Sequence, residues 1–398
     1  MIKFSIDYFN ETLFFKKLDY SNKLILNAVT DPLFIYDNKL NKYKCNACEK
    51  YLIKGKKIII YLRNDLFFYD GKKVTAKDYI DAIKQNLNKV NSMEINIKSI
   101  VGKNGKIEIQ TKHKDKNILS KLSCYFFSPH LGSTSGRYFI YKITNKSILL
   151  KPNIHYRNKA KNDLKYIKLK TYQENKRAFE RKLVDISNNT FFDLNSNNKN
   201  NEKSGIIISL ELSTKIKIKD RELIIKSINK GSLVSKLGNA YYIKNDFFFN
   251  DYSNYKFKRK INYCKRSVVL VYNDFYPNYE IAKNIKIELE NNNYQVILKA
   301  ETYENIKVQT QYDIKLTLNY FEYIDDFYFY ESKYFTYIMK KNLFYKYLVK
   351  KQIYYNLINK SFKKQYIKEP LMSFYSNFYT NDLTNKFSYL NCNYNELN

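Results

Sequence analysis

A strand, a turn and a helix that follow one another early in the chain constrain the fold more than any other feature. Residues 57–62 form a short apolar run rich in β-branched side chains, which predicts a strand. Asp70-Gly71 is a tight-turn dipeptide. Thr75 then precedes apolar residues at helical spacing, with Asp78 three positions later, which is typical of a capped helix N-terminus. A strand that leads into a helix in this way favours an α/β fold.

Strand and helix signals alternate along the rest of the chain. The expected strands are 106–111, 147–150, 166–169, 267–271 and 294–298, and the expected helices are 174–183, 279–289 and 344–358. Three of these elements, 267–271, 279–289 and 294–298, form a β-α-β unit, while the Asn-, Lys- and Ser-rich stretch 188–204 predicts a linker or loop. With 398 residues and no fixed-period repeat, the chain is predicted to be an α/β protein with more than one lobe.

The net charge of +32 allows two interpretations. A basic chain can bind nucleic acid, because Lys and Arg release counterions from phosphates. However, the positive residues are mostly Lys and are spread along the whole sequence, and Tyr and Phe are abundant, with 40 and 27 copies. This composition favours a bias toward A- and T-rich codons. A nonspecific nucleic-acid-binding basic protein therefore stays a remote alternative, and no specific nucleic-acid partner is expected.

The five cysteines are an odd number and make a poor disulfide framework. Cys45 and Cys48 form a C-x-x-C motif, for which half of a zinc site, a redox pair and structural thiols are alternatives. No second pair follows at zinc-finger spacing, and the chain has only three histidines. Structural or incidental thiols are favoured, and neither a metal nor a cofactor is expected.

The first residues carry no basic region followed by an apolar run, and no early cysteine suits a lipid anchor. No stretch of about 18 uncharged apolar residues occurs either. As written, the sequence slightly favours a cytoplasmic protein, whereas a signal missing upstream would make it extracytoplasmic.

The segment 61–79, YLRNDLFFYDGKKVTAKDY, resembles the signature of the family 5 extracellular solute-binding proteins, LR-x-x-x-x-F-x-DG-x-x-V-T-A-x-D. This family comprises the oligopeptide-, dipeptide- and nickel-binding components of ABC transporters. Further pieces resemble the family in the same order, at 31–37, 132–138, 153–158 and 183–186. Arg137 and Arg157 depart from the family's Pro and Trp, and the chain is shorter than typical relatives after residue 186.

The resemblance implies a two-lobed, type II periplasmic-binding-protein-like clamp with a small additional N-terminal domain. Lobe I would combine residues 1–30, 133–205 and 365–398, the accessory domain would span 31–132, and lobe II would span 206–364. The residues that match the signature are expected to maintain the scaffold, through turns, caps and buried tyrosines. These residues are Asp70, Gly71, Thr75, Asp78, Gly132, Gly136, Tyr138, Tyr156 and Asp185.

The resemblance also implies a ligand site. Glu322 falls where peptide-binding relatives place an acidic residue against the ligand's ammonium group, and the neighbouring Tyr320, Phe321 and Tyr323 offer an aromatic cleft wall. The implied function is capture of a peptide or peptide-like solute between two lobes, by a monomer that serves an ABC permease. An intracellular ligand sensor or pathway binding module is the alternative. No G-x-S-x-G, H-E-x-x-H or G-x-G-x-x-G motif occurs, and no enzyme activity is expected.

Overall fold

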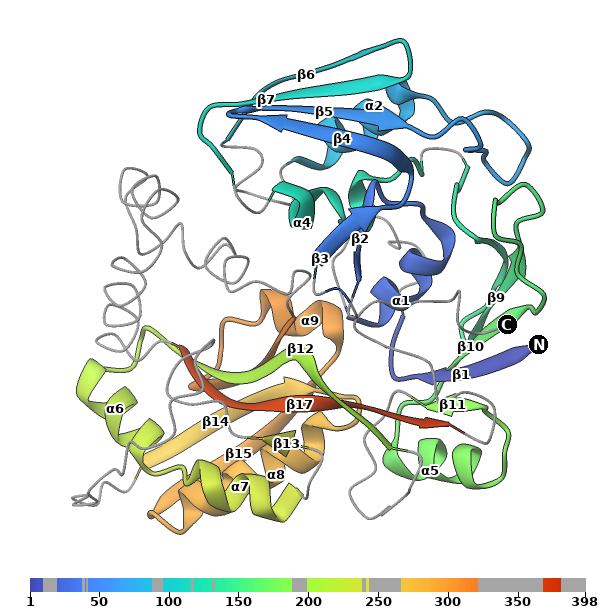
Figure 1. Ribbon diagram of the computed structural model, residues 1–398. Helices are drawn as coiled ribbons and strands as arrows, with labels where there is room; N and C mark the ends of the chain where they lie inside the picture. The colour runs from blue at the N-terminus through green and yellow to red at the C-terminus, as the bar shows by residue number, and fades with distance from the viewer. Residues whose placement is uncertain are drawn as a thin grey trace.

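The computed structural model has two large hydrophobic cores. One long sheet extends through both halves of the molecule (Figure 1). The first core consists of buried side chains between Phe4 and Ile186, and the second of buried side chains between Ile208 and Met372. The described residues are 1–9, 20–37, 40, 42–87, 96–115, 118–130, 133–187, 199–237, 241–242, 266–320 and 368–380. Among them, no helix is both long and apolar enough to cross a membrane.

The first core is built on one end of the long sheet. Its strands are β1 (Ile2–Ile6), β8 (Tyr138–Ile143), β9 (Ser147–Pro152), β10 (Leu164–Lys168) and β11 (Ile186–Ser187). The N-terminal strand β1 lies between β10 and β11 and runs parallel to both. The rings of Phe4 and Tyr166, which face each other in this register, stack with centroids 4.9 Å apart. Helices α1 (Tyr20–Val29) and α5 (Tyr172–Glu180) accompany these strands.

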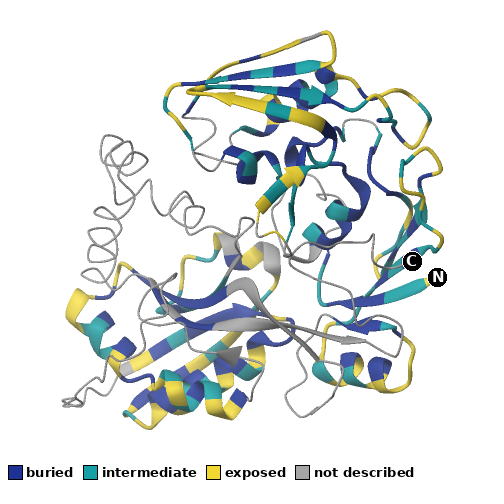
Figure 2. Ribbon diagram, viewed as in Figure 1, coloured by how far each residue is buried: buried dark blue, intermediate teal, exposed yellow. Residues whose placement is uncertain are grey.

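A smaller four-stranded sheet completes the first core and lies at the top of Figure 1. Its order is β4 (Cys48–Lys54), β5 (Lys57–Leu62), β7 (Lys106–Thr111) and β6 (Ile97–Lys103), all antiparallel. The hairpin β2 (Phe34–Asp37) and β3 (Lys42–Cys45), the helices α2 (Ala76–Asn86) and α4 (Ile118–Leu122), and the 3-10 turn η2 (Tyr125–Phe127) accompany it. Figure 2 shows that the edge strand β4 is largely exposed, whereas β5 alternates between buried and half-buried residues.

The second core contains the predicted β-α-β unit. Strands β14 (Arg266–Asn273) and β15 (Tyr294–Glu301) are parallel, and α8 (Asn278–Glu290) connects them. The side chains of Ile281, Ile285 and Leu289 repeat at helical spacing on α8 and are fully buried in this core. The remaining elements are α6 (Ile218–Lys226), α7 (Lys230–Leu237), β13 (Tyr241–Tyr242), α9 (Tyr303–Val308) and β16 (Ile314–Tyr320).

Two long antiparallel strands connect the two cores. The strands β12 (Lys199–Leu212) and β17 (Lys368–Thr380) pair with each other along most of their length. At one end, Thr380 of β17 faces Ile186 of β11 in the first core. At the other end, Leu371 and Met372 are buried in the second core. These crossing strands connect the two halves of the molecule.

Most of the predicted elements are confirmed. The predicted strands 57–62 and 106–111 coincide with β5 and β7, and the β-α-β unit is present with slightly longer strands. The linker predicted at 188–204 is wrong for its second part, because residues from Lys199 onward pair with β17 as part of β12. The polar composition of this stretch indicated a loop, because these residues form a strand only through pairing with β17. The predicted helix 344–358 lies outside the described residues.

Candidate functional site

The loop that follows β14 contacts the first half of the molecule. The backbone N–H of Tyr276 donates a hydrogen bond to the carbonyl oxygen of Lys170, at 3.0 Å. The rings of Tyr172 and Tyr276 lie 5.2 Å apart between centroids, and those of Tyr8 and Phe275 stack at 6.1 Å. We call this set of residues the lobe contact. It shows that the carboxyl end of β14 faces the first half. Open α/β sheets bind their ligands at the carboxyl ends of their strands.

Three acceptor oxygens beside the lobe contact have no hydrogen-bond partner among the described residues. They are Oδ1 of Asn273, Oδ1 of Asn278 and Oε2 of Glu280, which we call the β14-end cluster. The exposed fractions of Asn273 and Asn278 are only 7% and 0%. Burial raises the pKa of the Glu280 carboxyl. Buried acceptors without donors are costly, and a ligand that carries N–H groups would relieve that cost.

A second polar cluster joins the smaller sheet to the loop after β9, and its carboxylate is fully paired. The Asp31 carboxylate accepts two hydrogen bonds from the Arg157 guanidinium, at 2.6 and 2.9 Å. It also accepts from Asn46 Nδ2 at 2.8 Å and from the Tyr156 hydroxyl at 3.1 Å. The Tyr79 hydroxyl donates to the backbone carbonyl of Asp31 at 2.6 Å. We call these five residues the Asp31 cluster.

The electrostatics of the Asp31 cluster follow from its burial. The exposed fractions of the Arg157 and Asp31 side chains are 12% and 2%. Burial alone lowers the pKa of Arg157, but the hydrogen bonds and the charge of Asp31 outweigh it, and the pKa is raised. Burial and then the negative charge of Asp31 raise the pKa of the Tyr156 hydroxyl. Arg157 therefore remains charged and Tyr156 remains a hydrogen-bond donor at neutral pH.

The signature residues of the early strand-turn-helix form local turns and caps. Gly71 has φ +84°, and a Cβ at this position would lie 3.3 Å from the His155 imidazole. The Asp70 carboxylate accepts from the Lys72 backbone at 3.1 Å. The Asp78 carboxylate accepts from both the backbone N–H and the hydroxyl of Thr75, at 2.7 and 2.6 Å. These residues shape the entry into α2 and lie away from the lobe contact in sequence.

Other signature residues lie where segments distant in sequence meet. The Gly136 backbone N–H donates to the carbonyl of Val29 at 3.0 Å, and a Cβ at Gly136 would overlap the backbone of the segment 28–30. Tyr138 is buried at the start of β8, and burial raises its pKa to about 12. The Asp185 carboxylate accepts from the backbone N–H of Lys3 in β1 at 2.8 Å.

The residues predicted to bind the ligand fall almost entirely beyond what the structure describes. Tyr320 is the last residue of β16, and Phe321, Glu322 and Tyr323 lie outside the described residues, as does Gly132. Neither the lobe contact nor the β14-end cluster was predicted from the sequence. The predicted β-α-β unit was the available signal, because the residues after its first strand occupy the carboxyl edge of the sheet.

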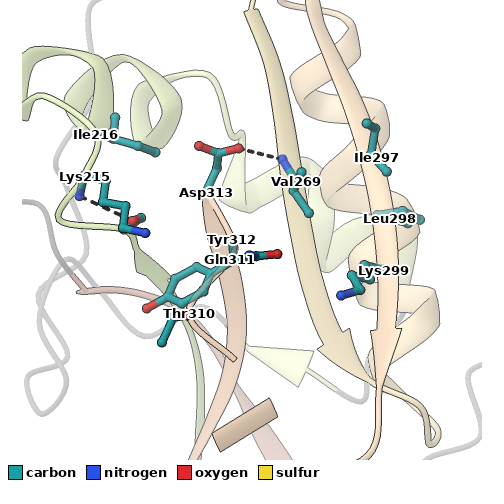
Figure 3. Close-up of a pocket in the computed structure, with 11 residues that line it drawn as sticks. Lys215, Ile216, Val269, Ile297, Leu298, Lys299, Thr310, Gln311, Tyr312 and Asp313 are labelled. Carbon is teal, nitrogen blue, oxygen red and sulfur yellow. Dashed lines mark hydrogen bonds between the residues drawn. The ribbon is translucent and has the colours of Figure 1, made fainter. Parts of the chain in front are cut away.

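A cavity of about 480 Å³ opens on the second half, between the loop 310–313, β14, β15 and the turn after β12 (Figure 3). Lys215 and Lys299 line it together with apolar side chains. Its Asp313 carboxylate already accepts a hydrogen bond from the Val269 backbone at 2.9 Å. This cavity lies beside the start of β16, whereas the lobe contact follows the end of β14. We therefore place the candidate site at the lobe contact.

No protein-family profile and no curated protein sequence matches the chain. Solved structures do match over nearly the full length. NikA from Staphylococcus aureus in complex with Ni(L-His)2 is 14% identical, with a TM-score of 0.80, and the match covers 98% of this chain and 97% of NikA. OppA from Haemophilus influenzae in complex with the peptide RPPGFSPFR is 12% identical, with a TM-score of 0.83, and the match covers 99% and 97% of the two chains.

DppA from Helicobacter pylori in complex with the peptide STSA is a third such structure. It is 14% identical, with a TM-score of 0.81, and the match covers all of this chain and 96% of DppA. At these identities the likeness shows the fold. The predicted fold class, a type II periplasmic-binding-protein-like α/β protein, is confirmed.

Proposed function

From the fold that this chain shares with the family 5 solute-binding proteins, we propose that it captures a peptide or peptide-like amine between its two halves. In this proposal it delivers the solute to an ABC permease. The observation that carries the proposal is the lobe contact, at which Tyr276 of the second half meets Lys170 of the first half. In this proposal, the crossing strands β12 and β17 serve as the hinge that such a clamp requires.

The chemistry of the described site favours a ligand with N–H donors. The β14-end cluster offers three acceptor oxygens that have no partner among the described residues. In the proposal, Glu322 follows β16 closely in sequence and supplies the carboxylate for the ligand's ammonium group. A charged pair of this kind stabilises binding when each member is fully hydrogen-bonded.

Isothermal titration calorimetry with a peptide library tests the proposed function. Glu322→Gln should weaken the binding of a retained peptide by about 1.5–3 kcal/mol, the scale of a hydrogen bond to a charged group. This is a rise in Kd of about 10- to 150-fold. N-acetylation of the same peptide should weaken binding by a similar factor, and the two losses should not add, because each removes the same ion pair.

Glu290→Gln is the matched control. Glu290 ends α8, and its carboxylate pairs at the surface with Lys286 at 3.4 Å. This variant should bind the peptide as the natural sequence does. Additive losses for Glu322→Gln and acetylation would contradict the role of Glu322 alone. A library from which no peptide binds would contradict peptide capture itself.

A further inference from the structure

The two cysteines of the C-x-x-C motif lie in direct contact. Cys45 ends β3 and Cys48 begins β4, so only Asn46 and Ala47 separate them along the chain. The two Sγ atoms lie 2.7 Å apart, and both cysteines are free thiols in this structure. Cys48 is only 1% exposed, whereas Cys45 is partly exposed. Cys45 is therefore the more exposed residue of the pair, and Cys48 is buried.

Backbone hydrogen bonds hold this connection in place. The N–H groups of Asn46 and Ala47 donate to the carbonyl oxygens of Leu33 and Pro32, at 3.0 and 3.2 Å. The carbonyl of Ala47 accepts from the backbone of Arg63 at 3.1 Å. Neighbouring segments on both sides therefore fix the turn that brings the sulfurs together. A covalent disulfide has an S–S distance of about 2.05 Å, so closing the bond needs little movement of this backbone.

A zinc site is less well supported by the same surroundings. A structural zinc ion takes four ligands, commonly Cys and His. In the part of the chain that the structure describes, no group of three His, Cys, Asp or Glu side chains is arranged to hold a metal ion. The contact between two thiols is instead the geometry of a dithiol that can oxidise.

We propose that Cys45 and Cys48 form a reversible disulfide by exchange with a small-molecule disulfide such as oxidised glutathione. The Cys45 thiolate attacks the oxidant, forms a mixed disulfide and releases one thiol. The Cys48 sulfur then attacks Cys45, loses its proton and releases the second thiol. In total two protein thiols are oxidised to one disulfide, and one disulfide oxidant is reduced to two thiols. A dithiol reductant reverses the sequence.

The order of attack follows from the surroundings of the two sulfurs. Burial raises the pKa of the Cys48 thiol, and the adjacent Cys45 raises it further. Cys48 therefore does not react first with the oxidant. It gives up its proton only in the second step, to the leaving thiolate, and serves as the resolving residue. Cys45 is the more exposed of the two residues, so in the proposal its sulfur reacts with the soluble oxidant first.

The disulfide would stiffen the Asp31 cluster. Asn46 lies between the two cysteines, donates to Asp31 Oδ1 at 2.8 Å and accepts from Arg157 at 2.8 Å. A disulfide between Cys45 and Cys48 would restrict the motion of Asn46, which lies between them. Asn46 contacts both members of the ion pair between Asp31 and Arg157. Oxidation would therefore strengthen the joint between the smaller sheet and the loop after β9, independently of whether the protein binds a peptide.

Peptide mapping of the full-length protein tests the proposal. The protein is incubated with oxidised glutathione or with dithiothreitol, denatured, alkylated with iodoacetamide and digested with trypsin. Both cysteines fall in one tryptic peptide, CNACEK, which spans 45–50. After oxidation this peptide should be unalkylated and lighter by two hydrogens, and after reduction it should carry two alkyl groups. The buried Cys124 should be alkylated in both samples.

Two variants separate this pair from other thiol chemistry. Cys48→Ser should stop at a stable glutathione adduct on Cys45, whereas Cys48 in the Cys45→Ser variant should remain unmodified under the same treatment. In the natural sequence, oxidation should slow hydrogen exchange of the amides at 46–48, and the Cys45→Ser variant should show no such change. A persistent glutathione adduct on the natural protein, two alkylated cysteines after oxidation, or a disulfide to Cys124, Cys264 or Cys392 would overturn the proposal.

Discussion

The Asp31 cluster and the β14-end cluster contain similar buried groups but differ in how they are satisfied. In the Asp31 cluster the carboxylate pairs with Arg157 and also accepts from Asn46 and Tyr156. In the β14-end cluster, Asn273, Asn278 and Glu280 each keep an oxygen without a partner among the described residues. One cluster lies within the first half of the molecule, and the other lies beside the contact between the halves.

This difference distinguishes the Asp31 cluster, which stabilises the fold, from the β14-end cluster, whose acceptors a ligand could satisfy. Removing one partner from a buried, fully paired cluster leaves an uncompensated charge and costs stability. A buried acceptor without a donor already destabilises the protein, so a substitution that removes the acceptor should increase the free energy of unfolding. Substitutions in the Asp31 cluster should therefore destabilise the protein, whereas removal of an unpaired acceptor from the β14-end cluster should stabilise it.

Arg157→Met should destabilise the protein by about 3–5 kcal/mol, because it leaves the Asp31 carboxylate buried without its cation. Chemical denaturation followed by circular dichroism measures the loss. Lys77→Met is the control, since Lys77 forms an exposed i,i+4 pair with Asp81 on α2. This control should leave stability essentially unchanged, because an exposed ion pair of this kind contributes little. Equal effects of the two variants would contradict the structural role of the Asp31 cluster.

Gly136→Ala should cost about 1–3 kcal/mol, because the new methyl group would overlap the backbone that precedes Asp31. Gly231→Ala in α7 is the matched control, with only Asn229 Oδ1 near the added Cβ, at 3.4 Å. Since Ala favours helices over Gly, the control should be neutral or stabilising by up to about 1 kcal/mol. Thermal unfolding of both variants measures the difference. A tolerated Gly136→Ala would show that the approach of these two segments can relax.

Glu280→Gln should stabilise the protein at pH 7 by about 1 kcal/mol or less, because it removes a partly buried charge whose Oε2 has no hydrogen-bond partner among the described residues. Burial raises the folded-state pKa of Glu280, so the natural carboxylate carries its full cost only above that pKa. As pH falls through the raised pKa, Glu280 becomes protonated and the advantage of Gln shrinks. The advantage should vanish below the ordinary pKa of 4.5.

Denaturation curves for the Glu280→Gln variant between pH 4 and pH 8 measure this dependence, with Glu290→Gln as the control. A destabilised Glu280→Gln variant at pH 7 would show that the carboxylate has a favourable partner.

The same variant also tests whether the β14-end cluster contributes to the proposed ligand binding. If the β14-end cluster binds ligand donors, Glu280→Gln should bind the retained peptide more weakly while it unfolds at a higher denaturant concentration.

Local patterns predicted the elements that form from neighbouring residues. The strand at 57–62 and the helix that starts after Thr75 were correct because side-chain alternation and the Asp78 cap act over a few residues. The polar start of β12 was missed because its order comes from pairing with β17, whose residues lie far away in sequence. For the same reason the lobe contact was missed, since Lys170 and Tyr276 meet only in the folded chain.

The sequence by itself determined the α/β class, the order of the early elements and the likeness to solute-binding proteins, because turns, caps and apolar periodicity are short-range properties. Only the tertiary structure decided what Arg157 does. As a departure from the family's Trp it had no role in the sequence argument, yet it pairs with Asp31 across 126 positions. Charge pairing depends on distance in space, and a sequence without its fold does not contain that distance.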